Sequence, residues 1–224
     1  MDLSEAIRLE RPEDGVAVMR MDNGENRFTP GVNEHLNTLL DAVDADDSIG
    51  SLVVTGTGKF FSNGFDIEAL TGAGDDALAF VAHTEKIWAR LMAAPYTVVT
   101  AVNGHAFGAG AMLALAGDLR VGRTERGFWC LPEADLGMPF SPAMMALFDD
   151  VLGRPVVAPL MATSARLAPE AQLEAGVVQQ LVAVEELDGA AVAMAKGAAH
   201  RRSANLGRIK KLIHGEAISL AGRV

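Results

Sequence analysis

The sequence is poor in cysteine, in tyrosine and in positive charge. Cys130 is the only cysteine among the 224 residues, so the chain can form no internal disulfide and has too few thiols for a zinc cluster. Lys and Arg number 19 against 29 Asp and Glu, and the net charge of −10 argues against a protein held broadly on nucleic acid. Only 21% of the residues are charged and 50% are hydrophobic, which excludes a disordered or coiled-coil chain. The composition is that of a compact globular protein in a reducing compartment.

Targeting and membrane-spanning segments are not expected either. Residues 1–14 are rich in charged side chains and contain no apolar stretch, unlike a secretory signal. Residues 91–117 contain no Asp, Glu, Lys or Arg and exceed the length of a bilayer span. Pro95, Gly108 and Gly110 would nevertheless break a helix within the bilayer, where freed backbone groups find no water. We therefore expect no contact with a membrane and a cytoplasmic location.

Three short apolar runs rich in β-branched residues predict strands, at residues 16–21, 52–55 and 97–102. Between the first two runs, apolar residues recur at helical spacing after residues 29–30, a Thr-Pro pair that supplies an N-cap and a preset first turn. A second amphipathic pattern covers residues 78–92. Strands that alternate with helices are typical of βαβ units, so we expect an α/β protein whose helices pack on the sheet.

Strand signals fade after Ser141. Three dipeptides, Ser141-Pro142, Arg154-Pro155 and Ala168-Pro169, are each typical of a helix start, so the C-terminal third is expected to be mainly helical. No repeat and no low-complexity linker marks a firm boundary. We place a division near Gly153, which separates residues 1–153 from residues 154–224.

Two glycine-containing turns follow predicted strands. The first, residues 56–67 (GTGKFFSNGFDI), has Gly64 at its centre. The second, residues 101–110 (AVNGHAFGAG), leads into a helix of small residues at 111–116. Such turns expose backbone N–H groups, and a helix N-terminus favours negative charge. Two such donors that converge from separate loops would form an oxyanion hole.

In this order and at this separation, the two turns resemble those of the crotonase family, the enoyl-CoA hydratases and isomerases. Residues 26–30 (NRFTP), 117–121 (GDLRV) and 131–137 (LPEADLG) match further parts of the family pattern, so the resemblance covers nearly the whole chain. The segments FFSNGFD and NGHA most resemble Δ3,Δ2-enoyl-CoA isomerases of the plant type. The resemblance implies a spiral core of repeated ββα units and a helical C-terminal region that builds homotrimers or hexamers.

The resemblance also implies a substrate and a set of site residues. An acyl-CoA thioester would bind at the two turns, with its carbonyl oxygen held by the amides of Phe65 and Ala109 and with Glu133 as the proton shuttle. No metal or redox cofactor is implied, because coenzyme A belongs to the substrate. The residues expected to bind the substrate are Arg27, Lys59, Ser62, Asn63, Gly64, Asp66, Ile67 and Gly108.

The number of acids distinguishes the reactions of this family. Hydratases use two glutamates, and the position of the first is Met112 here, while the second matches Glu133. Movement of a double bond needs only one carboxylate, which lifts a proton from C2 and returns it to C4. Dienoyl isomerases carry further acids, one of them where this chain has Ser141. The resemblance therefore favours an enoyl-CoA isomerase, with hydration or another crotonase reaction as the alternative.

Other polar residues have structural explanations. Asp66 is expected to hold its own loop by Asx hydrogen bonds, and Asp135 to cap a turn or pair with an arginine. His105 is expected to serve turn structure, and Cys130 to be an inert buried thiol. A basic cluster, whose contact with coenzyme A stays open, comprises Arg201, Arg202, Arg208, Lys210 and Lys211.

Two other classes of function are open. The spacing of Gly104, Gly108 and Gly110 after a strand imitates the nucleotide turn of short-chain dehydrogenases. That turn should follow the first strand, however, and the only tyrosine, Tyr96, has Thr100 rather than lysine four residues on. The second alternative is a pseudoenzyme that binds acyl-CoA without turning it over.

Overall fold

The computed structural model of the protein describes residues 2–223, and a sheet of six strands forms its centre. Within these residues its strand order is β1-β2-β3-β5-β7-β9, with β1 antiparallel to β2 and every other pair parallel. The predicted strands are confirmed as β2, β3 and β5. The bounds are β1 (Ile7–Glu13), β2 (Val16–Met21), β3 (Ser51–Gly56), β5 (Thr97–Val102), β7 (Leu119–Arg123) and β9 (Gln180–Val182).

Strands β1, β7 and β9 were not predicted, because none of them carries a continuous apolar run. β1 lies at the edge of the sheet, and its second half, which includes Arg11 and Glu13, is exposed. An edge strand of this kind is held by backbone pairing, and its charged side chains point to water. β9 has only three residues, so it is too short for a periodic pattern.

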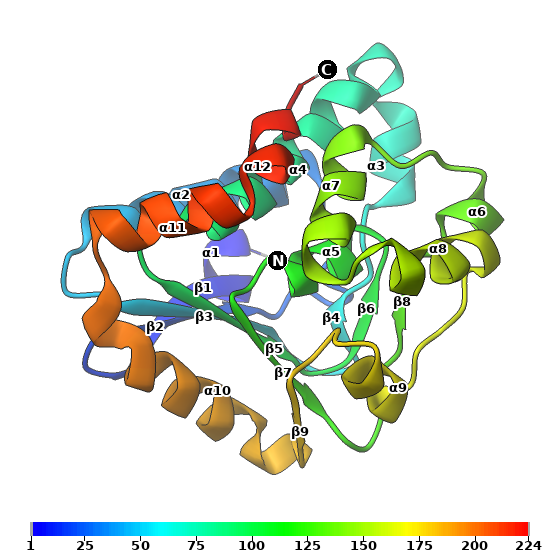
Figure 1. The fold of residues 1–224 in the computed structure, drawn as a ribbon. Coiled ribbons are helices and arrows are strands. Elements are labelled where there is room, and N and C mark those ends of the chain that lie inside the picture. Colours follow the sequence, from blue (N-terminus) through cyan, green and yellow to red (C-terminus); the bar gives the residue numbers. More distant parts are fainter. Residues whose placement is uncertain (1, 224) are drawn as a thin grey trace.

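Helices cover both faces of the main sheet (Figure 1). Helices α2 (Pro30–Ala45) and α4 (Ala77–Ala93) contribute to the large core on one face, together with residues such as Met19 and Leu52. Helix α10 (Val184–Ala198) covers the other face, where Leu187 packs with strand residues such as Val18 and Val53. Adjacent strand residues thus enter opposite cores, as the period of two requires.

A second, smaller sheet consists of β4, β6 and β8, in that order and all parallel. It lies beside α5 and below α7, to the right of the main sheet in Figure 1. The strands of this sheet are β4 (Phe60–Ser62), β6 (His105–Phe107) and β8 (Trp129–Cys130). The remaining helices are α1 (Leu3–Ala6), α3 (Ile67–Gly72), α5 (Ala109–Leu115), α6 (Glu133–Leu136), α7 (Pro142–Val151), α8 (Arg154–Thr163), α9 (Pro169–Glu174), α11 (Ala204–Ile213) and α12 (Gly215–Leu220).

The predicted helix starts are confirmed. The Thr29 hydroxyl accepts a hydrogen bond from the Val32 amide and caps α2, and Ser141 caps α7 in the same way. Prolines occupy the first turn of α2, α7, α8 and α9, where their missing N–H costs nothing. None of the helices within residues 2–223 is long and apolar enough to cross a bilayer.

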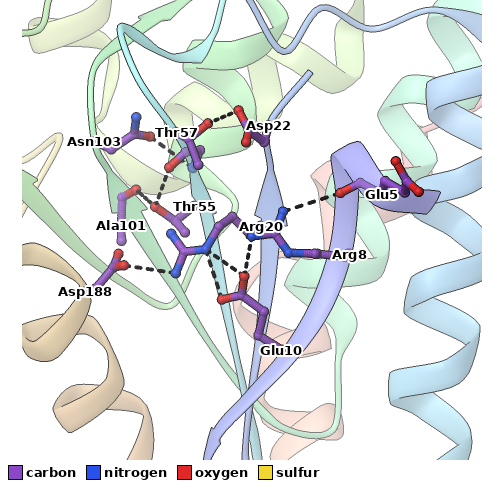
Figure 2. A network of polar contacts seen from close by, with 11 residues as sticks. Glu5, Arg8, Glu10, Arg20, Asp22, Thr55, Thr57, Ala101, Asn103 and Asp188 are labelled. Carbon is purple, nitrogen blue, oxygen red and sulfur yellow. Dashed lines mark hydrogen bonds and ion pairs between the residues drawn. The ribbon is translucent and has the colours of Figure 1, made fainter. Parts of the chain in front are cut away.

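The C-terminal region, residues 154–224, contributes to the main sheet as well as to the helical part. It supplies β9, which pairs with β7, and α10, which closes the second face. The mixed α/β fold with a helical C-terminal region is thus confirmed. Figure 2 shows how Arg20 of β2 secures α10, because its guanidinium bonds Glu10 of β1 at 2.9 Å and Asp188 of α10 at 2.9 Å.

Two residues of the basic cluster at 201–211, Arg202 and Lys210, form hydrogen bonds that hold the fold together. Arg202 donates hydrogen bonds to the carbonyl oxygens of Val43 and Ile49, at 3.2 and 2.6 Å, and so anchors the chain at the C-terminal end of α2. Lys210 is buried, with 2% exposure. Its ammonium donates to the Leu91 carbonyl at 2.9 Å and to the Asp118 carboxylate at 2.7 Å. Neither Arg202 nor Lys210 lines either of the two cavities that border Glu133.

We expect Lys210→Met to lower the free energy of unfolding by about 2 to 4 kcal/mol, because it removes the ammonium that donates to the Asp118 carboxylate and to the Leu91 and Tyr96 carbonyls. Lys211→Met is the matched control, since Lys211 is exposed on the same helix, and should change stability by less than about 0.5 kcal/mol. Urea unfolding monitored by circular dichroism measures both. Equal losses in the two variants would contradict a structural role for the buried ammonium.

Candidate active site

The candidate site lies where the three strands of the small sheet end. Because β4, β6 and β8 are parallel, their carboxyl ends share one edge, the usual place for a ligand in parallel sheets. β4 leads into the turn at residues 63–65, β6 into residues 108–109, and β8 into residues 131–133. Segments that are far apart in the sequence therefore meet at one place.

The first two turns touch through their backbones. Gly64 has a φ of +81°, and a methyl group on it would lie 2.7 Å from the Phe107 carbonyl oxygen and 3.2 Å from the Ala109 amide nitrogen. At Gly110, a methyl group would lie 2.2 Å from the carbonyl oxygen of Ser62. A side chain at either glycine would thus force the two turns apart.

Two buried asparagines hold the first turn in place. Asn103, at the end of β5, accepts a hydrogen bond from the Gly56 amide at 2.9 Å through its Oδ1. Asn26 donates from Nδ2 to the carbonyl oxygens of Phe60 and Phe61, at 3.2 and 3.1 Å. Figure 2 shows Asn103 near Thr55, which belongs to β3, and Thr57, which follows β3. These bonds connect the first turn to the segment before α2, through Asn26, and to the segment after β5, through Asn103.

The amides of Phe65 and Ala109 are free. Within residues 2–223, neither N–H donates a hydrogen bond to the backbone or to a side chain. At Phe65 the neighbouring groups are paired, since the Gly64 carbonyl accepts from the Phe28 amide and the Asp66 amide donates to the Phe28 carbonyl. At Ala109 the N–H opens α5 and has no preceding turn to bond. Both donors border the same cavity.

Glu133 is the buried acid of this cavity. It is 7% exposed, and its Oε2 has no hydrogen-bond partner within the described chain. Burial disfavours the charged carboxylate and raises the pKa of Glu133 from 4.5 to about 7. Glu133 begins α6 directly after Pro132, and its Oε1 lies close to Gly108, where a methyl group would approach it to 3.3 Å. An acid with this pKa can both take and return a proton near neutral pH.

Two cavities meet at Glu133. The first has a volume of about 250 Å³ and is lined by Arg27, Asn63, Gly64, Phe65, Ile67, Phe107, Gly108, Ala109, Pro132, Glu133, Leu136 and Met138. The second, of about 440 Å³, shares Phe65, Glu133 and Met138 with the first. Its other lining residues come mainly from α4 and from residues 138–144. Phe65 and Glu133 therefore border both cavities, and Ala109 borders the first.

Some of the residues predicted to bind the substrate line the first cavity, and the others do not. Arg27, Asn63, Gly64, Ile67 and Gly108 border the first cavity. Asn63 donates to the Glu25 carboxylate at 2.8 Å, and Arg27 pairs with the same carboxylate at 2.6 Å.

Three further predicted residues do not border either cavity. The hydroxyl of Ser62 donates to the Asn26 carbonyl at 2.7 Å, and the Asp66 carboxylate accepts from the Ala69 amide at 2.9 Å as the cap of α3. The bonding of Asp66 within its own loop is thus confirmed. Lys59 is exposed, and its ammonium lies 5.1 Å from the centre of the Phe60 ring. Contacts of these three residues with substrate stay predictions.

Three residues near the site, Met112, His105 and Cys130, were expected to take no part in proton transfer, and each has a structural environment that agrees with this. Met112 is fully buried in the core on α5. The His105 ring stacks on Phe128 and accepts from its amide at 3.0 Å, and burial lowers the pKa of His105. Cys130 is buried, and burial raises the pKa of its thiol, as an inert cysteine requires.

Some residues that line the two cavities were not predicted from the sequence. Phe107 and Met138 border the first cavity, and Glu85, from α4, borders the second. Glu85 was hidden within an amphipathic pattern, in which one charge on the apolar face was the only available signal.

Similarity to known proteins identifies the family of this chain. The family model described as enoyl-CoA hydratase/isomerase matches residues 11–220. The chain therefore belongs to the enoyl-CoA hydratase/isomerase family, and the resemblance to crotonases is confirmed.

Among curated relatives, the peroxisomal enoyl-CoA delta isomerase 1 of Arabidopsis thaliana is 29% identical over 159 residues, which cover 70% of this chain and 66% of the relative. Enoyl-CoA hydratase AKT6-1 of Alternaria alternata is 31% identical over 183 residues, 80% of this chain and 56% of the relative. The chain thus spans between about half and two thirds of the length of these relatives. An apo structure of an enoyl-CoA isomerase from Mycobacterium tuberculosis superposes with a TM-score of 0.88 at 28% identity, over 97% of this chain and 95% of that one.

We expect Gly64→Ala to destabilise the protein by about 2 kcal/mol or more, because the methyl group would meet the Phe107 carbonyl at a φ of +81°. Gly72→Ala is the control, since a methyl group there meets nothing within 4 Å. That change should leave stability unchanged or raise it by up to about 1 kcal/mol. Thermal unfolding measures both, and equal stability of the two variants would contradict the close contact between the turns.

Proposed function

We propose that the protein is an enoyl-CoA isomerase that moves a double bond from C3 to C2 of an acyl-CoA thioester. The observation that carries the proposal is the pair of free amides, Phe65 and Ala109, which border one cavity with the buried carboxyl of Glu133. The carboxyl has a pKa raised to about 7. The membership in the enoyl-CoA hydratase/isomerase family supports the choice of a thioester substrate.

In the proposed reaction, the amides of Phe65 and Ala109 donate hydrogen bonds to the thioester oxygen. Glu133 removes a proton from C2, the electron pair moves onto the carbonyl oxygen, and an enolate forms. The two fixed donors stabilise that oxygen more as its charge grows, so they lower the barrier. The loss of one such donor typically costs about 3 kcal/mol. Glu133 then returns the proton to C4, and the double bond lies between C2 and C3.

The apolar surroundings favour isomerisation over addition of water. Within the described chain, Glu133 is the only acid that borders the first cavity. Met112, at the position of the first hydratase glutamate, is buried and cannot orient a water molecule. One carboxylate is sufficient for a proton transfer from C2 to C4. Hydration is the second candidate, because relatives named hydratases are among the matches.

We propose further that coenzyme A enters along the first cavity past Arg27 and Asn63, with Lys59 near its phosphates. No cofactor besides the coenzyme A of the substrate is proposed. A homotrimer or hexamer and a cytoplasmic location are proposed from the family resemblance and the composition. The plant relatives include proteins named as peroxisomal, so the location is best tested by fractionation of cells that produce this protein.

The reaction is tested by incubation of the purified protein with 3-enoyl-CoA and with 2-enoyl-CoA, followed by chromatography of the products. We expect 3-enoyl-CoA to become 2-enoyl-CoA, with little 3-hydroxyacyl-CoA. Glu133→Gln should reduce the rate by about 10³-fold or more while affinity for coenzyme A thioesters persists. Formation of 3-hydroxyacyl-CoA at a comparable rate would favour hydration. Binding without turnover by either protein would indicate a pseudoenzyme.

The pH dependence tests the role of Glu133 independently. A general base must be ionised, and the pKa of Glu133 is raised to about 7 by burial. We therefore expect kcat/KM to rise about tenfold per pH unit below 7 and to level off above it. Initial rates from pH 5 to 9 measure this, with circular dichroism to show that the protein stays folded. A midpoint near 4.5, the ordinary value for glutamate, would contradict a base in this buried position.

A further inference from the structure

The second cavity contains a buried acid that the proposed reaction does not use. Glu85 of α4 is only 3% exposed and borders this cavity together with Glu133. The α4 residues that face the cavity are Ala77, Leu78, Val81, Ala82 and Glu85, a spacing that places them on one face of the helix. Glu85 is the last of them, so it lies at the far end of this helical wall from Ala77.

The carboxylate of Glu85 is held in position but has spare acceptor capacity. The Ser141 hydroxyl donates to its Oε1, and the Gly222 amide donates to its Oε2 at 3.0 Å. A carboxylate offers about four acceptor sites, so two remain. Within residues 2–223 no cation pairs with Glu85, although Arg223 also borders the cavity.

The walls around this acid are apolar. The larger apolar residues of the lining are Phe65, Leu70, Leu78, Val81, Met138, Phe140 and Met144. Burial of a carboxylate among such side chains is unfavourable unless its hydrogen bonds are satisfied. A leucine at position 85 would match a purely hydrocarbon acyl chain, but it would leave the Ser141 hydroxyl and the Gly222 amide without their acceptor.

We propose that Glu85 is a specificity residue that accepts a hydrogen bond from a hydroxyl group on the part of the acyl chain that lies in the second cavity. This inference rests on the proposed function, in which the acyl chain extends from Glu133 into the second cavity. A hydroxyl group there occupies a free acceptor site of the carboxylate, whereas a terminal methyl group leaves that site without water or a partner. Sites of this kind reject the analogue that lacks the hydroxyl.

Binding of saturated thioesters tests the inference, because these compounds have no double bond to move. Matched pairs of acyl-CoA and ω-hydroxyacyl-CoA of increasing chain length are titrated into the protein by calorimetry. At one or more lengths, we expect the hydroxylated member to bind at least about tenfold more tightly. Glu85→Leu should remove or reverse that preference. Glu68→Gln is the control, since Glu68 is exposed on α3 and borders neither cavity.

Each outcome decides a different point. If the methyl-ended thioester binds as tightly or more tightly at every length, the inference is wrong and the proposed function stands. If neither member of any pair binds, the proposed function fails and the inference fails with it. A preference for the hydroxyl that persists in Glu85→Leu would also overturn the role of Glu85. If that variant does not fold, the wild-type preference alone can still refute the inference.

Discussion

The parallel alignment of three very short strands is the constraint on which the site depends. Strands β4, β6 and β8 have two or three residues each, yet their pairing brings three carboxyl ends to one edge. The turns that follow β4 and β6 approach each other so closely that a methyl group on Gly64 or Gly110 would clash with the opposite backbone. Phe65, Ala109 and Glu133, which are far apart in the sequence, thus border one cavity.

Burial then determines the chemistry of the two acids in this region. Glu133 lacks a partner for Oε2, and its pKa rises to about 7, the range in which a carboxyl can exchange protons. Glu85 is buried equally deeply, but a hydroxyl and an amide donate to it. The same residue type is therefore left without a donor on one oxygen in one place and bonded by two donors in the other.

The sequence predicted the elements with long, regular patterns. β2, β3, β5 and the capped helices α2 and α7 followed from periodicity and from Thr29 and Ser141. The site residues at positions 65, 109 and 133 followed from motifs. β1 could not be recognised because an edge strand needs no apolar run, and the small sheet could not because its strands are shorter than any period.

By itself, the sequence determined the family, the α/β class and the absence of an acid at Met112, since these depend on local patterns and on residue identity. Only the tertiary structure decided that Phe65 and Ala109, whose amides are free within the described chain, share a cavity with Glu133, that the Lys210 ammonium is buried, and that Glu85 borders the second cavity. The physical reason is that burial, and with it the pKa of an acid and the cost of an unpaired group, arises from segments far apart in the chain.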